Sequence, residues 1–260
     1  MNETALKREN SSQTSTTHKK RLYLQLLLVL LALGSLFLLA SKWNSQQSIS
    51  KITITGNKII SVSEIENKIF VNNFHLPAID VELSQIRERV QSHSFVKYAN
   101  VFKKNSDVIE VEITERKPVA YLLDDTGTIR YTDETGSVFA YRIYNEMPDL
   151  PVISGVAFHN KICNEALAGA LEIINQSKLS NMSLISEVSE IIYEPVSHSY
   201  RLLVTDRGYE IVLGQTRDLN NKMEMLSKLW KSYLTKQSTC VISNIDLRWN
   251  EKVVVKFKKV

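Results

Sequence analysis

An uncharged apolar run near the N-terminus constrains this chain more than any other feature. Residues 22–40 contain no charged side chain, and only Tyr23, Gln25, Gly34 and Ser35 interrupt the apolar sequence. As an α-helix, these 19 residues would extend about 28 Å, close to the thickness of the hydrocarbon core of a bilayer. The run therefore predicts a transmembrane helix over residues 22–41.

A cleaved signal peptide is the alternative to a permanent anchor. Its apolar core is shorter, about 7–15 residues, and ends at a site with small residues two positions apart. Here Leu38 stands two positions before Ala40, so that pattern is missing. Basic residues gather before the run, and one follows it: Lys7, Arg8, Lys19, Lys20 and Arg21, then Lys42. By the positive-inside rule, residues 1–21 form a cytoplasmic tail, which we expect to be disordered, and residues 43–260 lie outside.

The net charge and the cysteine content bear on two possibilities, nucleic-acid binding and a disulfide scaffold. The net charge is +4, and part of it belongs to the N-terminal basic cluster, so the composition gives no indication of nucleic-acid binding. Cys163 and Cys240 are the only cysteines. One bridge between them or two unpaired thiols both fit the sequence, and neither is a disulfide scaffold.

The first part of the outer chain, residues 49–117, has the periodicity of a small α+β unit. Ser61 and Glu64 form a capping box that begins a helix, which we expect to bury Val62, Ile65 and Ile69. The predicted order is a strand, two helices and two strands, at 51–56, from 62, from about 81, at 95–102 and at 108–114.

The second part, residues 118–260, is β-rich. Two turns of similar sequence, at 125–127 and 134–136, predict a β-meander. Helices are expected at 165–176 and 218–234, and strands at 188–193, 200–204, 209–213, 242–249 and 252–259. The fold class is therefore α+β, with a βααββ unit followed by a β-rich mixed α/β unit.

No combination of residues in the sequence indicates a catalytic site. Asp125-Thr126-Gly127 is the tripeptide of aspartic proteases, but the second turn offers Glu134 where that chemistry needs another aspartate. No pair of histidines has metal-ligand spacing, and no phosphate-binding glycine loop or nucleophile elbow occurs. We expect no catalytic residue, cofactor, metal or small-molecule substrate.

The final strand is a candidate surface for a partner. Residues 252–259 read KVVVKFKK, a β-prone stretch with several lysines. Lysines protect free sheet edges, and a free edge can also accept a partner strand. An internal strand that is paired on both sides fits the sequence equally well.

A series of motifs resembles the FtsQ/DivIB family of bacterial cell-division proteins. The hinge-like stretch 111–120, VEITERKPVA, is similar to the family pattern I-x-V-x-E-R-x-P-V-A. Other matching stretches occur in the family order: 54–57, 62–65, 95–101, 131–139, 150–155 and 245–249. The tryptophan-proline pair that the family carries before its V-x-I strand is replaced here by residues 103–106, KKNS. This resemblance implies a POTRA domain at 49–117 and a β domain at 118–260.

The resemblance also implies a function. The family is a non-catalytic, single-pass scaffold of the inner membrane at the division septum, which binds FtsB- and FtsL-like proteins and helps to control septal peptidoglycan synthesis. The family's partner-binding strand falls here on Arg248, Trp249, Asn250, Lys252, Val253, Val254, Val255 and Phe257. Trp249 stands where the family has tyrosine. The alternatives are a POTRA component of outer-membrane assembly or secretion, which continues into a long β-barrel, and an anchored enzyme, which needs a pocket of perturbed titratable groups.

Overall fold

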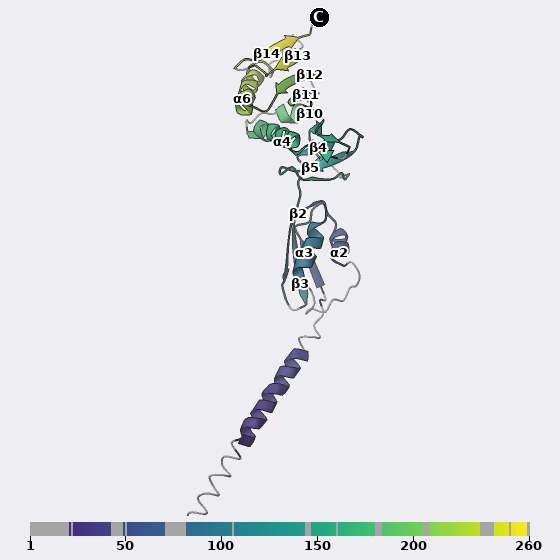
Figure 1. The fold of residues 1–260 in the computed structure, drawn as a ribbon, viewed down its shortest axis with the longest axis vertical. Coiled ribbons are helices and arrows are strands. Elements are labelled where there is room, and N and C mark those ends of the chain that lie inside the picture. Colours follow the sequence, from purple (N-terminus) through teal and green to yellow (C-terminus); the bar gives the residue numbers. More distant parts are fainter. Residues whose placement is uncertain are drawn as a thin grey trace, which may run out of the picture. The chain divides into compact units, whose positions relative to one another are not determined.

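The computed structural model describes residues 21, 23–42, 49, 51–70, 82–105, 107–143, 147–159, 161–179, 184–204, 208–234, 242–249 and 251–258. The chain divides into two units, Met1–Glu115 and Arg116–Val260, and each unit is described by itself (Figure 1). Residues 1–20, the predicted cytoplasmic tail, lie outside the described part.

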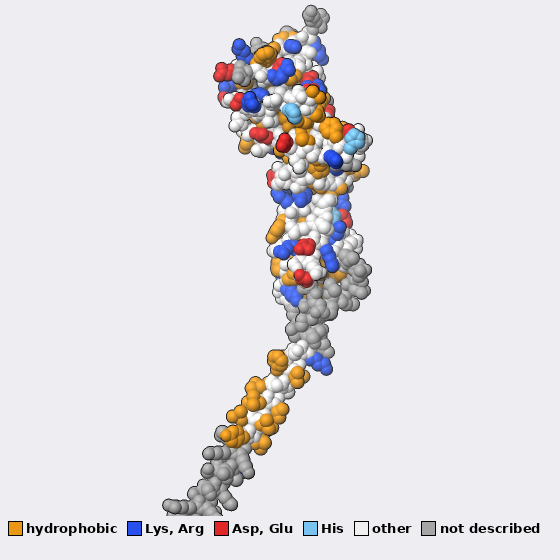
Figure 2. All heavy atoms as spheres, in the orientation of Figure 1, with side chains coloured by type: hydrophobic (Ala, Val, Ile, Leu, Met, Phe, Trp, Pro, Cys, Tyr) orange, Lys and Arg blue, Asp and Glu red, His pale blue; other side chains and the backbone are white. Residues whose placement is uncertain are grey.

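The N-terminal helix Tyr23–Lys42 is long and apolar enough to cross a membrane, and within the described part of the chain no other helix is. Its leucine side chains are exposed, and Figure 2 shows apolar side chains along its surface. This helix matches the predicted span of residues 22–41.

The globular part of the first unit has the predicted order of elements. Its elements are β1 (Lys51–Thr55), α2 (Val62–Ile69), α3 (Leu83–Gln91), β2 (Val96–Lys103) and β3 (Val108–Glu115). The strand β3 lies at the centre of the sheet, parallel to β1 and antiparallel to β2. The βααββ prediction is therefore confirmed.

Local sequence signals explain these elements. Ile109, Val111 and Ile113 alternate along β3 and are all buried. The helix α2 begins at the predicted capping box, where Glu64 N donates to Ser61 Oγ over 3.3 Å. The expectation that Val62 is buried was wrong, because its side chain is 45% exposed. Val62 occupies the first turn, which the capping residues hold at the surface, whereas Ile65 and Ile69 lie one turn apart on the buried face.

The second unit is built on one nine-stranded sheet in the order β14-β13-β12-β11-β10-β7-β4-β5-β6. The strands are β4 (Ala120–Leu123), β5 (Ile129–Thr132), β6 (Val138–Ala140), β7 (Val152–Ser154), β10 (Val188–Glu194), β11 (Ser199–Val204), β12 (Tyr209–Gly214), β13 (Ile242–Asp246) and β14 (Val254–Phe257). The remaining elements are a two-stranded hairpin, β8 (Ala157–Phe158) and β9 (Lys161–Ile162), the helices α4 (Asn164–Leu179), α5 (Leu184–Glu187) and α6 (Leu219–Leu229), and the π-helical turn η1 (Trp230–Leu234).

The core of the second unit lies on one face of this sheet. Register-matched residues of neighbouring strands form an apolar row that is almost fully buried: Leu122, Ile153, Ile191, Leu202, Ile211 and Ile245. Ile173 of α4 and Met223 and Leu226 of α6 belong to the same buried cluster. The two helices therefore cover this face.

Several features of the second unit differ from the sequence prediction, among them the hairpin of β8 and β9 and the short helix α5, which were not predicted. The strand β7 was not predicted, and it lies between β4 and β10, parallel to both, where it joins the meander to the later strands. Three residues are too few for an alternation to be visible. The last strands are also shorter than the predicted 242–249 and 252–259, because β13 ends at Asp246 and β14 extends only from Val254 to Phe257.

Candidate interaction edge

The strand β14 lies at one end of the nine-stranded sheet. It pairs antiparallel with β13, with Val255 opposite Ile245 and Val254 opposite Asp246, and no other described strand pairs with it. An edge strand presents a row of backbone N–H and C=O groups to the surroundings. Of the two arrangements that the sequence left open, the structure has the open edge.

Buried side chains hold this edge against the body of the unit. Ile245 and Leu247 are both fully buried in the core cluster. Leu247 N also donates to Val212 O over 2.9 Å, which extends the contact with β12 beyond the end of β13. Val253 is partly buried and packs against this core, and Val255 is partly buried opposite the core residue Ile245. These contacts therefore hold the edge of the sheet against the core of the second unit.

Arg248 is fixed in place by its own strand. Its Nη2 lies 2.7 Å from Asp246 Oδ2, and its Nε and backbone N each donate to Asp246 Oδ1 over 3.0 Å. The hydrogen bonds from the Arg248 side chain hold the pKa of Asp246 below its usual value, although burial of the carboxyl acts in the opposite direction. The guanidinium is thus presented at the surface in one orientation.

Gly214, the last residue of β12, makes room for the stem of Arg248. Its φ is +74°, and a Cβ at this position would lie 2.9 Å from Arg248 Cγ. Both the backbone conformation and the close approach therefore favour glycine here. Sequence reasoning missed Gly214 and Asp246. Asp246 was detectable, because residues two apart on an extended chain point to the same side.

Trp249 follows Arg248 and is 59% exposed. Its side chain borders a hollow of about 490 Å³ whose other walls are Asn221, Lys222, Glu224, Met225 and Lys228 of α6, with Asp218 and Glu251. Lys222 Nζ donates to Leu213 O over 3.0 Å and to Gln215 O over 2.7 Å, so its ammonium is committed to the backbone. Burial lowers the pKa of Lys222. The exposed indole thus lies beside a mixed polar and apolar hollow.

The structure brings most of the predicted site residues together on the β13–β14 connection and β14. Val254 is 40% exposed and Phe257 is 50% exposed, and Lys252 is also exposed. Asn250 lies outside the described residues. We call the described residues of this segment, 248, 249 and 251–258, the edge strip.

The twin turns of the meander have a structural role. Asp133 Oδ1 accepts hydrogen bonds from Thr135 N, Thr135 Oγ1 and Ser137 N at 2.9, 2.6 and 3.0 Å, and Asp124 holds the preceding turn in the same way. Burial favours a higher pKa for Asp133, but the hydrogen bonds from Thr135, Arg116 and Ser137 outweigh it, and the pKa lies below the usual value. The residues that carried the protease motif thus lie on hairpin turns.

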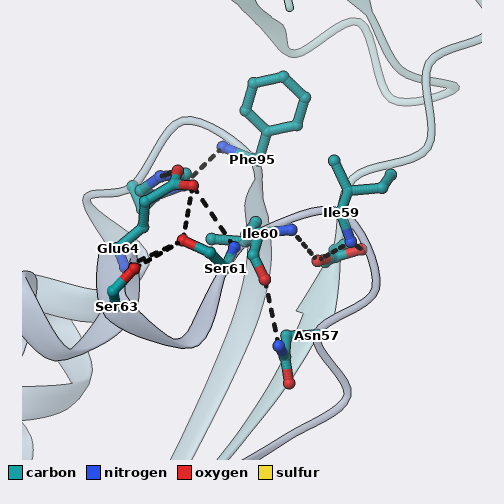
Figure 3. A network of polar contacts seen from close by, with 9 residues as sticks. Asn57, Ile59, Ile60, Ser61, Ser63, Glu64 and Phe95 are labelled. Atoms are coloured by element: carbon teal, nitrogen blue, oxygen red, sulfur yellow. Dashed lines mark hydrogen bonds and ion pairs between the residues drawn. The ribbon is translucent and has the colours of Figure 1, made fainter. Parts of the chain in front are cut away.

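Glu115 and Arg116 are adjacent at the boundary between the two units, and each side chain forms its contacts within its own unit. The Glu115 carboxylate accepts hydrogen bonds from the backbone N–H groups of Lys58, Ile59 and Ile60 at 2.8, 2.9 and 2.8 Å. Figure 3 shows this loop with the capping box that follows it. Arg116 Nη1 lies 2.7 Å from Asp133 Oδ2 in the second unit. The Glu-Arg pair of the hinge-like motif thus closes one unit and opens the next.

Among the described residues, no group of three or more histidine, cysteine, aspartate or glutamate side chains could hold a metal ion. Cys163 is exposed and free, which is the unpaired arrangement of the two that the sequence left open, and Cys240 lies outside the described part.

Comparison with known proteins agrees with this architecture. The model "FtsQ/DivIB, C-terminal related" matches residues 117–256, and the model "POTRA domain, FtsQ-type" matches residues 47–116. The cell division protein FtsQ of Geotalea daltonii is 29% identical over 68% of this chain and 64% of its own length, so this chain matches less than two thirds of that relative. The cell division protein FtsQ of Geobacter sp. (strain M21) is 23% identical over 82% of this chain and 80% of its own. The major extracytoplasmic domain of DivIB from Geobacillus stearothermophilus is 20% identical, covers 48% of this chain and 99% of its own, and superposes with a TM-score of 0.33. Because the two family models together span residues 47–256, this chain belongs to the FtsQ/DivIB family of cell-division proteins, with a POTRA domain ahead of the family's C-terminal domain.

Proposed function

We propose that this chain is a non-catalytic, single-pass scaffold of the bacterial divisome that binds FtsB- and FtsL-like proteins and thereby contributes to the control of septal peptidoglycan synthesis. The observation that carries the proposal is the open edge of β14, with Val254, Phe257 and Trp249 exposed along it. A partner segment adds to this edge as a further strand, because main-chain hydrogen bonds supply affinity there. Trp249 and Arg248 are of the side-chain types that most often dominate interfaces.

The proposed membrane arrangement rests on the N-terminal helix. Residues 23–42 anchor the chain in the inner membrane with the N-terminus in the cytoplasm, since basic residues precede the span. The POTRA and C-terminal domains then lie in the periplasm and act at the septum.

Site-specific photo-crosslinking in dividing cells tests the proposal. A photoreactive residue is placed at Val254 or Trp249, and as a control at Ile129, which is 44% exposed and belongs to β5, near the other end of the sheet. We expect Val254 and Trp249, but not Ile129, to crosslink to a small bitopic protein. The double variant Trp249→Glu, Val254→Glu should abolish binding of that protein, and Ile129→Glu should retain it.

Two results would contradict the proposal. Undiminished binding by the double variant would show that the partner uses another surface. Crosslinks to outer-membrane proteins alone would favour a role in outer-membrane assembly or secretion.

A further inference from the structure

The edge strip has two chemically different sides. Val253 and Val255 point toward the core face, and Phe257 lies opposite the core-packed Ile242. Lys256 lies opposite Asn244 on the other face. Because side chains alternate along a strand, Lys252, Lys256 and Lys258 share this second face with Val254. One side is apolar and the other is basic.

The basic side is only weakly neutralised within the chain: after Arg248, the charge of Lys256 also lowers the pKa of Asp246. Lys252, Lys256 and Lys258 are exposed, and within the described residues no carboxylate lies within ion-pair distance of their ammonium groups. Asp246, the acid on this face of β13, is bound by Arg248. Residues 246–258 contain four cationic and two anionic side chains. This side of β14 therefore has a positive potential, which a negatively charged partner can neutralise.

We propose that β14 selects a partner strand in which acidic and apolar residues alternate. This inference rests on the proposed strand addition at the edge strip and names the chemistry of the strand that is added. Side chains directly opposite each other on neighbouring strands lie about 4.5–5.5 Å apart, so acidic residues on one side meet the lysines. Apolar residues at the intervening positions extend the contact of Val253, Val255 and Phe257. The alternation holds for either strand direction, because the side-chain period is two in both.

The same lysines act against a second copy of this chain at the edge. In an antiparallel pair of β14 strands centred on Val255, Lys252 of each copy faces Lys258 of the other. Centring the pair on Val254 places Lys252 opposite Lys256, and centring it on Lys256 places that residue opposite itself. Like charges directly opposite each other are destabilising. The edge is thereby selective for a different, acidic strand.

Peptide binding to the full chain in lipid nanodiscs tests the inference. The probes are fluorescent heptapeptides that alternate glutamate with valine, lysine with valine, or threonine with valine, each flanked by Gly-Ser. At low ionic strength we expect the glutamate peptide to bind about tenfold more tightly than the threonine peptide, from several cross-strand ion pairs of about 0.2–1 kcal/mol each. The difference should vanish in ~1 M NaCl, where the Debye length is about 3 Å. An N-methylated glutamate peptide, which lacks backbone donors at alternate positions, should not bind.

Charge reversal identifies the lysines. The variant Lys256→Glu should lose the preference for the glutamate peptide and gain one for the lysine peptide. The matched control Lys161→Glu reverses an exposed lysine of β9 in the same domain and should leave the preference unchanged.

The outcomes separate the two proposals. Equal affinity for all three peptides, with loss on N-methylation, would overturn the acidic selection and leave strand addition standing. An unchanged preference in Lys256→Glu would also overturn it. Failure of every peptide to bind would overturn strand addition together with this inference.

Discussion

Arg248, the first residue of the edge strip, forms a two-nitrogen, two-oxygen ion pair with Asp246. Nη2 lies 2.7 Å from Oδ2 and Nε lies 3.0 Å from Oδ1. The carboxylate side chain is 9% exposed and the arginine side chain is 57% exposed. The Asp246 carboxylate is therefore held inside the protein, and the Arg248 guanidinium lies at the surface.

This pair should contribute to stability in a pH-dependent way. The pKa of Asp246 is lowered, chiefly by the hydrogen bonds from Arg248. The contribution is therefore present above the unfolded pKa of about 3.9 and is lost as the pH falls through the lower folded pKa. Asp246→Asn should lower the free energy of unfolding by about 1 kcal/mol at pH 7, because one partner is solvent-exposed. Urea titrations from neutral pH to below pH ~3 should show this difference shrinking in the acid range.

The matched control for Asp246→Asn is Glu224→Gln. Glu224 pairs with Lys228 one helical turn away, and both side chains are more than half exposed. Its removal should cost much less than the removal of Asp246, because solvent screens an exposed pair. Equal losses in the two variants would mean that Asp246 makes no special contribution.

Gly214→Ala should displace Arg248 as well as strain the backbone. The new Cβ would meet Arg248 Cγ at 2.9 Å, in addition to the cost of a φ of +74°. We expect a loss of about 2 kcal/mol, of which about 1 kcal/mol is the strain of a non-glycine residue at positive φ. Thermal unfolding measures the loss.

Gly127→Ala separates the two causes, because Gly127 has a φ of +82° and no atom near the new Cβ. It should show the backbone cost alone. An identical loss in both variants would exclude a steric contribution from Arg248.

Glu115→Gln should destabilise the POTRA domain specifically. The carboxylate accepts three backbone N–H groups of the loop at residues 58–60. A neutral amide keeps one acceptor oxygen and loses the charge, so we expect a loss of about 1.5–3 kcal/mol. Hydrogen exchange should accelerate at Lys58, Ile59 and Ile60. Glu112→Gln, on the exposed face of the same strand, should leave these amides protected.

Lys258→Glu should make the edge strip self-complementary. In the antiparallel pair centred on Val255, Lys252 of each copy would then face the introduced glutamate of the other, which replaces two repulsive pairs by two attractive ones. Analytical ultracentrifugation of nanodisc-embedded chain should show concentration-dependent dimers for Lys258→Glu. Lys258→Gln, which removes charge without adding an acid, should show fewer dimers. A purely monomeric Lys258→Glu variant would contradict the assigned faces of β14.

The proposed orientation can be tested through the exposed thiol of Cys163. In a Cys240→Ser background, a membrane-impermeant maleimide should label Cys163 in spheroplasts without lysis. A cysteine placed at Ser12, in a variant without the native cysteines, should be labelled only after lysis. Labelling of Ser12→Cys in intact spheroplasts would reverse the assigned topology.

Features with a short sequence range were predictable from the chain alone. The apolar run determines a helix that is long and apolar enough to cross a membrane, because its length and lack of charge are properties of the sequence itself. The capping box at Ser61 and Glu64 determines the start of α2, and the alternation of Ile109, Val111 and Ile113 determines the buried face of β3. Each of these signals lies within a single helix or a single strand and needs no contact with a distant part of the chain.

Features that depend on strand pairing were decided only by the tertiary structure. Whether residues 254–257 form an open edge depends on which strand lies beside them, and a strand has the same local sequence at an edge as inside a sheet. The position of β7 between β4 and β10 joins segments far apart in the chain. Gly214 and Arg248 are likewise distant in sequence, so their contact exists only once β12 and β13 lie side by side. The sequence alone thus determined a long apolar helix followed by two folded domains, and long-range hydrogen bonding decided that β14 is the last of the described strands at one end of the second sheet.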